Sequence, residues 1–464
     1  MRWIRASCAN EARSGKKRGF WVRRGSATCG GGAQPGRGTC FAAPPAMFTA
    51  ERQARVACPD CGLVQRLPAV RRRHIAECRR CGRLLAGPAA GRVDAPLALA
   101  LAALLLLIPA TVEPLLRVAS HGAARISWLW SGIAGLWREG FAPLATIVGA
   151  FSLALPYIYL AGLIGVLLSL RLGLRPHVGL AFRWVMRLRP WMMLEIFLVG
   201  CFVAYSRLRL VVGVHVLEGG WCLLAATAAL LLAMTQLDER TVWEALPLRY
   251  ERDQHGRVGP HVCQRDSDPR AIACTACELL VTAAHEGSAC PRCAATLHER
   301  KPHAFTVTAA LVAAAFLLYV PANALPVLTL VSFGHEQSST LITGVLELIH
   351  NRLWPLALIV FLASIVVPLL KLCGLTWMLL ATLQGSSRLL IGRTRFFRLI
   401  DTVGSWSNID VFVASVLVAL LQFGAVAQAR AASGLTAFAA VVILTMIATR
   451  TFDTRLMWDA PQGG

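Results

Sequence analysis

The sequence predicts an all-α polytopic membrane protein with two tandem four-helix transmembrane modules, each preceded by a small cytoplasmic zinc ribbon. The composition, eight long apolar segments and two sets of paired cysteines support this fold class. Of the 464 residues, 56% are hydrophobic and only 16% are charged, whereas soluble domains carry about 25% charged residues. The net charge of +22 is typical of arginine-rich loops that face anionic lipid on the cytoplasmic side.

Residues 1–46 form a basic extension that is rich in arginine, glycine and small residues and contains a single acid, Glu11. No apolar segment of a secretory signal follows the basic residues, and a chain of this composition is expected to be disordered. Because Met47 opens a more ordinary sequence, a misassigned translation start is an alternative explanation for the extension.

The first ribbon is predicted at residues 55–88. Cys58-Pro-Asp-Cys61 and Cys78-Arg-Arg-Cys81 are separated by sixteen residues. Two thiolate pairs at this spacing close a tetrahedral Zn²⁺ site, and four thiolates leave no open position for catalysis. The alternative, a pair of redox dithiols, would need a βαβ pattern that is absent here. The pattern therefore indicates a structural zinc ion.

The first transmembrane module is predicted at residues 95–245. Its four apolar segments are each long enough, at about 20 residues, to cross a bilayer. An arginine-rich loop lies between the second and third segments, which places this loop and the preceding ribbon in the cytoplasm. The segments cover about residues 95–118, 141–170, 191–212 and 219–237.

The second half of the chain has the same organisation. A second ribbon at residues 260–303 contains another four-thiolate pattern, so His261 and Cys263 just upstream are expected to be bystanders. The second module, residues 304–460, would return the C-terminus to the cytoplasmic side where the N-terminus lies. The predicted ligands are Cys274, Cys277, Cys290 and Cys293, and the apolar segments cover about residues 305–331, 353–384, 404–428 and 434–451.

The two halves are one unit repeated. An offset of 212 residues aligns Cys78 with Cys290 and Pro109 with Pro321. An offset of 215 aligns Glu195 with Asp410, and a three-residue insertion in the second half accounts for the difference. Because each unit has an even number of spans, the repeats are expected to be parallel and related by an axis along the membrane normal.

The second module carries ionisable residues inside apolar segments, which predicts a functional site. A lone charge in a bilayer core costs about 2.5–3.5 kcal/mol, so Lys371 and Asp410 are expected to lie against each other and partly cancel that cost. The alternatives are a structural staple, a lysine that reaches to the interface, and hydroxyls that bond only to their own helix. The predicted cluster contains Ser364, Lys371, Ser407, Asp410 and Thr445, with Glu195 as the corresponding acid of the first module.

Over about residues 55–460 the sequence resembles the paraquat-inducible protein A family, the integral inner-membrane subunits of Gram-negative lipid-transport systems. The resemblance rests on the duplicated cysteine ribbons, the paired modules, Pro-Leu-Leu-Lys at 368–371 and Trp-Ser-x-x-Asp-Val-Phe at 406–412. It implies a periplasmic MCE-domain partner that forms a tunnel, which this subunit would load with phospholipid or unload. It also implies that Lys371, Asp410 and the nearby hydroxyls are needed for transport. The extension at 1–46 matches no family element.

Three functions remain open from the sequence. A lipid-transport subunit would not be an enzyme. Nucleotide hydrolysis is not expected, because the chain has no phosphate-binding loop motif, and a buried Lys–Asp pair could instead take up and release a proton. A redox or quinone-linked protein would use the cysteine pairs, although no haem-type Cys-x-x-Cys-His occurs. A non-transporting scaffold would use its ribbons to bind a partner or lipid head groups. Nucleic acid is not an expected partner, because no aromatic residues interleave with the basic ones.

Overall fold

The computed structural model describes residues 55–67, 76–86, 93–120, 123–174, 177–209, 213–246, 248, 271–282, 286–332, 335–420 and 427–459. The basic extension and the bystanders His261 and Cys263 lie outside these ranges.

Within the described ranges, eight helical segments are long and apolar enough to cross a membrane, which confirms the predicted fold class. α1 (Asp94–Val112) and α7 (Glu218–Gln236) are single helices of module 1, and α9 (Ala304–Ala324) and α15 (Ser433–Thr451) are their counterparts in module 2. A 19-residue helix is about 28 Å long at 1.5 Å per residue, which matches a hydrocarbon core of about 30 Å.

The other four spans are composite. In module 1 they consist of α3 (Ala142–Gly149), η1 (Ala150–Ala154) and α4 (Leu155–Arg171), then α5 (Val178–Leu188), η2 (Arg189–Trp191) and α6 (Leu194–Leu208). In module 2 they consist of α11 (Trp354–Phe361), η4 (Leu362–Val366) and α12 (Val367–Leu383), then α13 (Leu390–Val403), η5 (Gly404–Asn408) and α14 (Ile409–Leu420). Shorter helices flank the spans: α2 (Ser131–Arg138), α8 (Glu239–Ala245), α10 (Leu341–His350) and α16 (Leu456–Asp459).

The repeat recognised in the sequence is also a repeat of structure. The bounds of α3, η1 and α4 recur 212 residues later in α11, η4 and α12, and those of α7 recur 215 residues later in α15. Both η1 and η4 are π-helical turns, and each contains a buried serine at the same position. Ser152 donates to the Val148 carbonyl at 2.7 Å and Ser364 to the Val360 carbonyl at 2.6 Å. Single π-turns are rare and cluster at functional sites.

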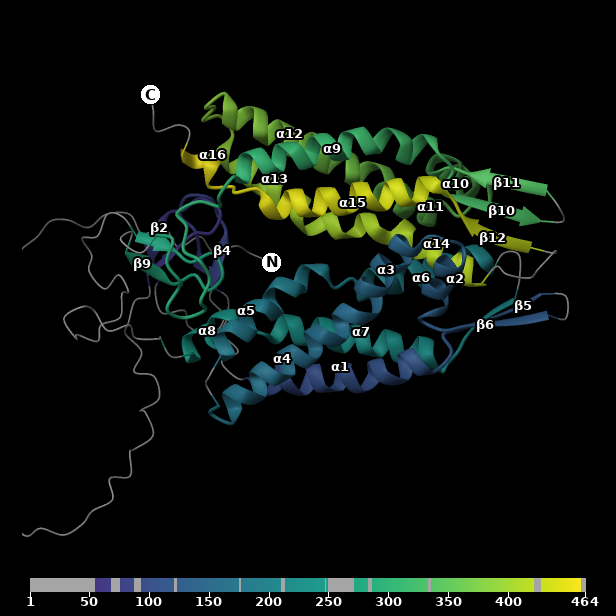
Figure 1. Ribbon diagram of the computed structural model, residues 1–464, viewed down its shortest axis with the longest axis horizontal. Helices are drawn as coiled ribbons and strands as arrows, with labels where there is room; N and C mark the ends of the chain where they lie inside the picture. Colours follow the sequence, from purple (N-terminus) through teal and green to yellow (C-terminus); the bar gives the residue numbers. More distant parts are fainter. Residues whose placement is uncertain are drawn as a thin grey trace, which may run out of the picture. The chain divides into compact units, whose positions relative to one another are not determined.

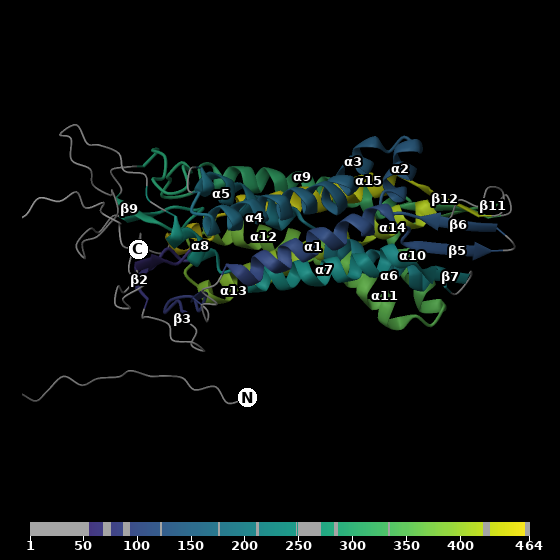
Figure 2. The same cartoon turned by 90° about the horizontal axis from the view of Figure 1, so that it is seen from below.

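Each module also carries a three-stranded antiparallel sheet, which the sequence analysis did not anticipate. In module 1, β5 (Leu116–Ser120) pairs with β6 (Ala123–Ser127) and β7 (Gly213–Val216). In module 2, β10 (Leu328–Ser332) pairs with β11 (His335–Ser339) and β12 (Ala427–Ala431). The expected first and fifth spans ran into these strands, but the helices end before Pro114 and Pro326, since a proline disfavours helical geometry in the preceding residue. The sheets lie at the opposite end of the helices from the ribbons (Figures 1 and 2).

The modules meet where equivalent helices pack on each other. α14 of module 2 packs against α6 and α2 of module 1. Phe197 and Phe412, which are repeat equivalents, form an edge-to-face pair with ring centroids 5.6 Å apart. Gly200 permits this approach, because a Cβ atom there would lie 2.9 Å from Cβ of Phe412. Contact between equivalent positions indicates that a pseudo-twofold axis passes close to this pair.

The first ribbon, which precedes module 1 in the sequence, packs on module 2. It consists of the hairpins β1 (Arg55–Ala57) with β2 (Val64–Arg66) and β3 (Ala76–Glu77) with β4 (Leu84–Ala86). Arg398 of α13 donates to Asp60 at 2.6 Å and to the Cys81 carbonyl at 3.2 Å. The Thr454 hydroxyl donates to the Asp60 carbonyl at 2.9 Å, and the Arg80 guanidinium lies 4.5 Å from the ring centroid of Trp458.

The second ribbon, which precedes module 2, packs on module 1. Its knuckles follow β8 (Ala271–Ala273) and β9 (Leu280–Thr282). Arg240 of α8 donates to Glu278 at 3.0 Å, and α5 approaches so closely that a Cβ atom on Gly179 would lie 2.5 Å from the Arg292 carbonyl oxygen. The ribbons are therefore exchanged between the modules: each ribbon packs on one module and is continuous in sequence with the other.

The exchanged contact of the first ribbon can be tested at Asp60. Its side chain is only 8% exposed and forms ion pairs with Arg83 and Arg398. Asp60→Ala is expected to lower the free energy of unfolding by about 1–3 kcal/mol, because two partly buried guanidinium groups lose their acceptor. Thermal unfolding of the purified chain measures the change. Asp94→Ala, which breaks an exposed pair with Arg171, is the control and should cost less than about 1 kcal/mol. Equal effects of the two variants would contradict the docking.

Candidate functional site

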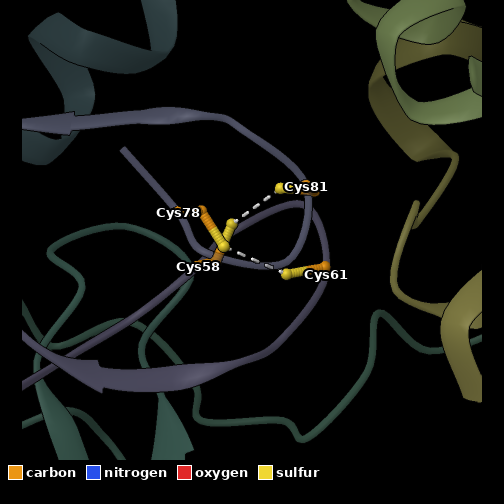
Figure 3. Close-up of side chains that lie close together, drawn as sticks. All are labelled: Cys58, Cys61, Cys78 and Cys81. Carbon is orange, nitrogen blue, oxygen red and sulfur yellow. Dashed lines mark hydrogen bonds between the residues drawn. The ribbon is translucent and has the colours of Figure 1, made fainter. Parts of the chain in front are cut away.

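Two groups of four cysteines could each hold a metal ion. In the first ribbon Cys58, Cys61, Cys78 and Cys81 are buried and their sulfur atoms converge (Figure 3). The sulfur atoms of Cys58 and Cys81, and of Cys61 and Cys78, lie 3.5 Å apart. Tetrahedral Zn²⁺ with bonds of about 2.3 Å holds its sulfur ligands about 3.8 Å apart, so the geometry fits this ion.

The second group repeats this arrangement. The sulfur atoms of Cys274 and Cys293 lie 3.5 Å apart, and those of Cys277 and Cys290 lie 3.6 Å apart. None of the eleven cysteines in the described ranges forms a disulfide. The approach of all four sulfur atoms in each group favours metal ligation over separate redox dithiols. Each metal would close two knuckles and so support the contacts between the ribbons and the opposite modules.

A cavity of about 520 Å³ lies between the two modules. It contains three cations and three acids, and methionines line part of its wall. Three pairs of repeat equivalents are among its lining residues: Met186 and Asp401, Arg189 and Gly404, and Met234 and Thr449. Module 1 contributes Met186, Arg189, Pro190, Met192, Glu195, Met234 and Glu239, and module 2 contributes Lys371, Asp401, Thr402, Gly404, Met446, Thr449 and Arg450. At two of the three paired positions, therefore, module 2 has a polar residue where module 1 has a methionine.

The depth of the cavity follows from the helix ends that line it. Met234 lies in the last turn of α7, and Thr449 and Arg450 lie in the last turn of α15. These ends are on the ribbon side, because Lys301, which follows the cysteine knuckles of the second ribbon, donates to the carbonyls of Arg450 and Phe452 at 2.7 and 3.2 Å. Burial lowers the pKa of Lys301. The cavity is therefore level with the ribbon-side ends of helices that match the hydrocarbon thickness.

Lys371 enters this cavity from α12. Its side chain is only 1% exposed, and its Nζ atom has no hydrogen-bond partner in the described part of the chain. Gly404 makes room for it, because a Cβ atom there would lie 2.4 Å from Cε and 2.9 Å from Nζ of Lys371. The charged groups that act on Lys371 are Asp401 and Arg450, which form an ion pair with each other at 3.4 Å.

Asp410 occupies a different environment at the start of α14. It is buried, one of its carboxylate oxygens has no described hydrogen-bond partner, and its polar neighbours are the Ser364 hydroxyl and the Arg207 guanidinium. Asn408, two residues earlier, directs its amide group towards the sulfur atom of Met193 in module 1, at 2.7 Å. Asp410 thus lies beside the π-helical turn and near the interface between the modules.

The predicted contact between Lys371 and Asp410 is wrong. No ion pair joins them within 4.0 Å, and the groups that act electrostatically on each do not include the other. The π-helical turn η4 alters the regular helical register that the seven-residue spacing of Ser364 and Lys371 assumed. As a result, Ser364 faces Asp410, whereas Lys371 faces Gly404.

Of the other predicted residues, only Glu195 lines the cavity. Glu195 is half-buried and lines the cavity together with Lys371. Ser407 and Thr445 are buried, and each donates to a carbonyl three residues earlier, at 2.9 Å in both cases. These two hydroxyls therefore have the local backbone partners that were weighed as the alternative to a functional role.

Sequence reasoning missed several polar residues of the cavity. Arg189 forms an ion pair with Glu239, and Asp401 forms one with Arg450. All four lie near helix ends, where a charged residue is most simply interpreted as an interfacial anchor. One signal in the sequence could have indicated the cavity: the repeat aligns Arg189 of module 1 with Gly404 of module 2. Module 2 therefore lacks a large side chain at this position and also carries Lys371, a lysine that module 1 lacks.

Substitution of Gly404 tests the position of Lys371. Gly404→Ala is expected to lower the free energy of unfolding by about 1–3 kcal/mol, because the new methyl group overlaps the lysine side chain. Lys371→Ala in the same chain should remove most of that cost. The control is Gly392→Ala in α13, where nothing obstructs a Cβ atom and the change should be neutral or stabilising. Thermal unfolding measures these free energies. If Gly404→Ala costs as much in the Lys371→Ala background as in the wild type, the contact between Gly404 and Lys371 is contradicted.

Comparison with known proteins gives consistent matches over both halves. The model of a family described as paraquat-inducible protein A matches residues 93–247 and 305–462. The chain is 30% identical to the Intermembrane transport protein PqiA of Escherichia coli K12, over 87% of this chain and 95% of the relative. It is 27% identical to the Lipophilic envelope-spanning tunnel protein A of the same strain, over 88% and 92%. It is 24% identical to a Probable intermembrane transport protein of Haemophilus influenzae, over 86% and 95%. No solved structure matches the chain.

Proposed function

Because the chain belongs to the paraquat-inducible protein A family, we propose that it is the integral inner-membrane subunit of an intermembrane phospholipid-transport system. In this role it loads phospholipid into a periplasmic MCE-domain tunnel protein or unloads it. The names of two relatives, an intermembrane transport protein and an envelope-spanning tunnel protein, support this role. Both termini and both ribbons lie in the cytoplasm, and the two ribbon sites hold Zn²⁺ as structural ions.

The observation that carries the proposal is a pair of charged residues that a membrane-spanning body keeps buried outside any ion pair within 4.0 Å among the described residues. Lys371 and Asp410 each have a polar atom without a described hydrogen-bond partner. A buried group of this kind lowers stability, so its presence is best explained by a role in the working cycle. The two residues have different roles in this proposal. Lys371 acts in the cavity between the modules, and Asp410 acts at the interface between the modules, beside the π-helical turn.

The surroundings of Asp410 support proton coupling as part of this proposal. Its unpaired oxygen can accept a proton, while Ser364 and Arg207 stabilise the ionised form when the proton leaves. α14 packs directly on α6 and α2 of module 1, so a change of charge at Asp410 would alter the contact between the modules. Such a change could alternately open and close the space between them.

The proposal is tested by purification of the full chain from its native membrane with gentle detergent. We expect an MCE-domain protein to co-purify and phospholipid to be extracted from the complex. The control is Asp60→Ala, which loosens a ribbon on the opposite side and should leave the partner bound. Recovery of the chain without an MCE partner, or of a complex with quinone in place of phospholipid, would overturn the proposal.

A further inference from the structure

We propose that the cavity between the modules binds the head group of a zwitterionic phospholipid from the ribbon-side leaflet, with its phosphate at Lys371 and its ammonium at Glu195. This inference rests on the proposed transport function and adds the substrate class and the groups that recognise it. The phosphate and the ammonium of one head group would join two charges that the protein itself leaves apart.

The balance of charges in the cavity leads to this assignment. Arg189 is already paired with Glu239, and Arg450 with Asp401. Lys371 and Glu195 remain, one from each module, and neither forms an ion pair within the described residues. A ligand with one negative and one positive group satisfies both, whereas a purely anionic ligand leaves Glu195 facing like charge.

The unpartnered lysine is the second, independent observation. The Lys371 Nζ atom is almost fully buried and has no described hydrogen-bond partner. Leaving a buried charged donor unsatisfied is costly, and an ammonium group is a good partner for phosphate oxygens. The Lys371 side chain lies against Gly404, and Lys371 lines the cavity of about 520 Å³. The donor therefore has the chemistry and the room for a phosphate group.

The depth and the lining of the cavity point to lipid. The cavity is level with the ribbon-side ends of α7 and α15, where the head groups of that leaflet lie. Four methionines, Met186, Met192, Met234 and Met446, line its wall, and such side chains adapt to the irregular shape of a glycerol and the first part of an acyl chain. A volume of about 520 Å³ falls within the usual range of about 300–1,000 Å³ for ligand sites.

Native mass spectrometry of the full chain tests the inference, with equimolar phosphatidylethanolamine and phosphatidylglycerol in detergent. We expect the wild-type chain to retain phosphatidylethanolamine preferentially. Lys371→Met should lower the occupancy of both lipids about tenfold, because the phosphate loses its partner. Glu195→Gln should lower only that of phosphatidylethanolamine and abolish the preference. Tyr159→Phe, at the position equivalent to Lys371 in module 1, is the matched control and should bind as the wild type does.

Several outcomes would overturn the inference. Wild-type occupancy in both Lys371→Met and Glu195→Gln would exclude the site. Displacement of the lipid by millimolar inorganic phosphate would identify a site for free phosphate. Should Lys371→Met fail to fold, Glu195→Gln decides through the lost preference. A Lys371→Met chain that binds lipid normally but does not transport it would refute this inference alone. Loss of binding with normal transport would instead refute the proposed role of the site in transport.

Discussion

Replacement of Cys58 by serine is expected to lower the metal content from about two ions per chain to about one and to loosen module 2. The reason is the exchange of ribbons: the first ribbon rests on Arg398 of α13 and on Thr454 and Trp458 near the C-terminus. Loss of a thiolate ligand opens the tetrahedral site, and metal binding is a large part of the folding free energy of such small domains.

Elemental analysis measures the metal, and hydrogen exchange locates the loosening. For Cys58→Ser we expect faster exchange in α13 and α16. For Cys274→Ser we expect it in α5 and α8, because the second ribbon contacts Arg240 and Gly179. Cys373→Ser, which changes an exposed cysteine outside both groups, should alter neither property. Faster exchange in the module that follows each ribbon along the chain would contradict the exchange of ribbons.

Lys371→Met and Asp410→Asn are each expected to lower phospholipid transport by about tenfold or more, while the folded protein becomes no less stable. A buried charge outside an ion pair costs free energy, so an apolar or neutral side chain of similar size lowers that cost. A gain in stability with a loss of activity is typical of functional sites. Tyr159→Phe and Ser152→Ala, at the positions equivalent to Lys371 and Ser364, serve as controls and should transport normally.

The double variant tests the separation of the two charges. Because Lys371 and Asp410 have different neighbours, their effects on the free energy of unfolding should add to within about 0.5 kcal/mol. Thermal unfolding of the wild type, both single variants and the double variant gives the coupling energy. A coupling well above that value would show that the two side chains interact directly, contrary to the geometry.

Much of the architecture could be predicted from the sequence because it depends on strong local signals. Apolar length gives the spans, paired cysteines give the metal clusters, and the constant offsets between Cys78 and Cys290 and between Glu195 and Asp410 give the repeat. The boundaries between helices and strands were harder to predict from the sequence. The expected first and fifth spans continued past Pro114 and Pro326, although the chain leaves the helix just before each of them to form a sheet.

The arrangement of the site depended on features that spacing does not encode. Ser364 and Lys371 share a face only on a regular helix, and the π-helical turn that contains Ser364 separates their directions. The cavity forms where the two modules meet, so the approach of Glu195 to the Lys371 side depends on packing between segments far apart in the sequence. The packing of each ribbon on the opposite module likewise depends on tertiary contacts, which the order of the elements along the chain does not reveal.

The most direct test of the central claim is phospholipid transfer by the reconstituted full chain. Donor vesicles would contain labelled phosphatidylethanolamine, the chain and its periplasmic MCE partner, and label would be measured in acceptor vesicles. The account predicts transfer well above that of protein-free vesicles, and a fall to that background for Asp410→Asn despite its normal folding. Wild-type transfer by Asp410→Asn, or no transfer by the wild-type chain, would contradict it.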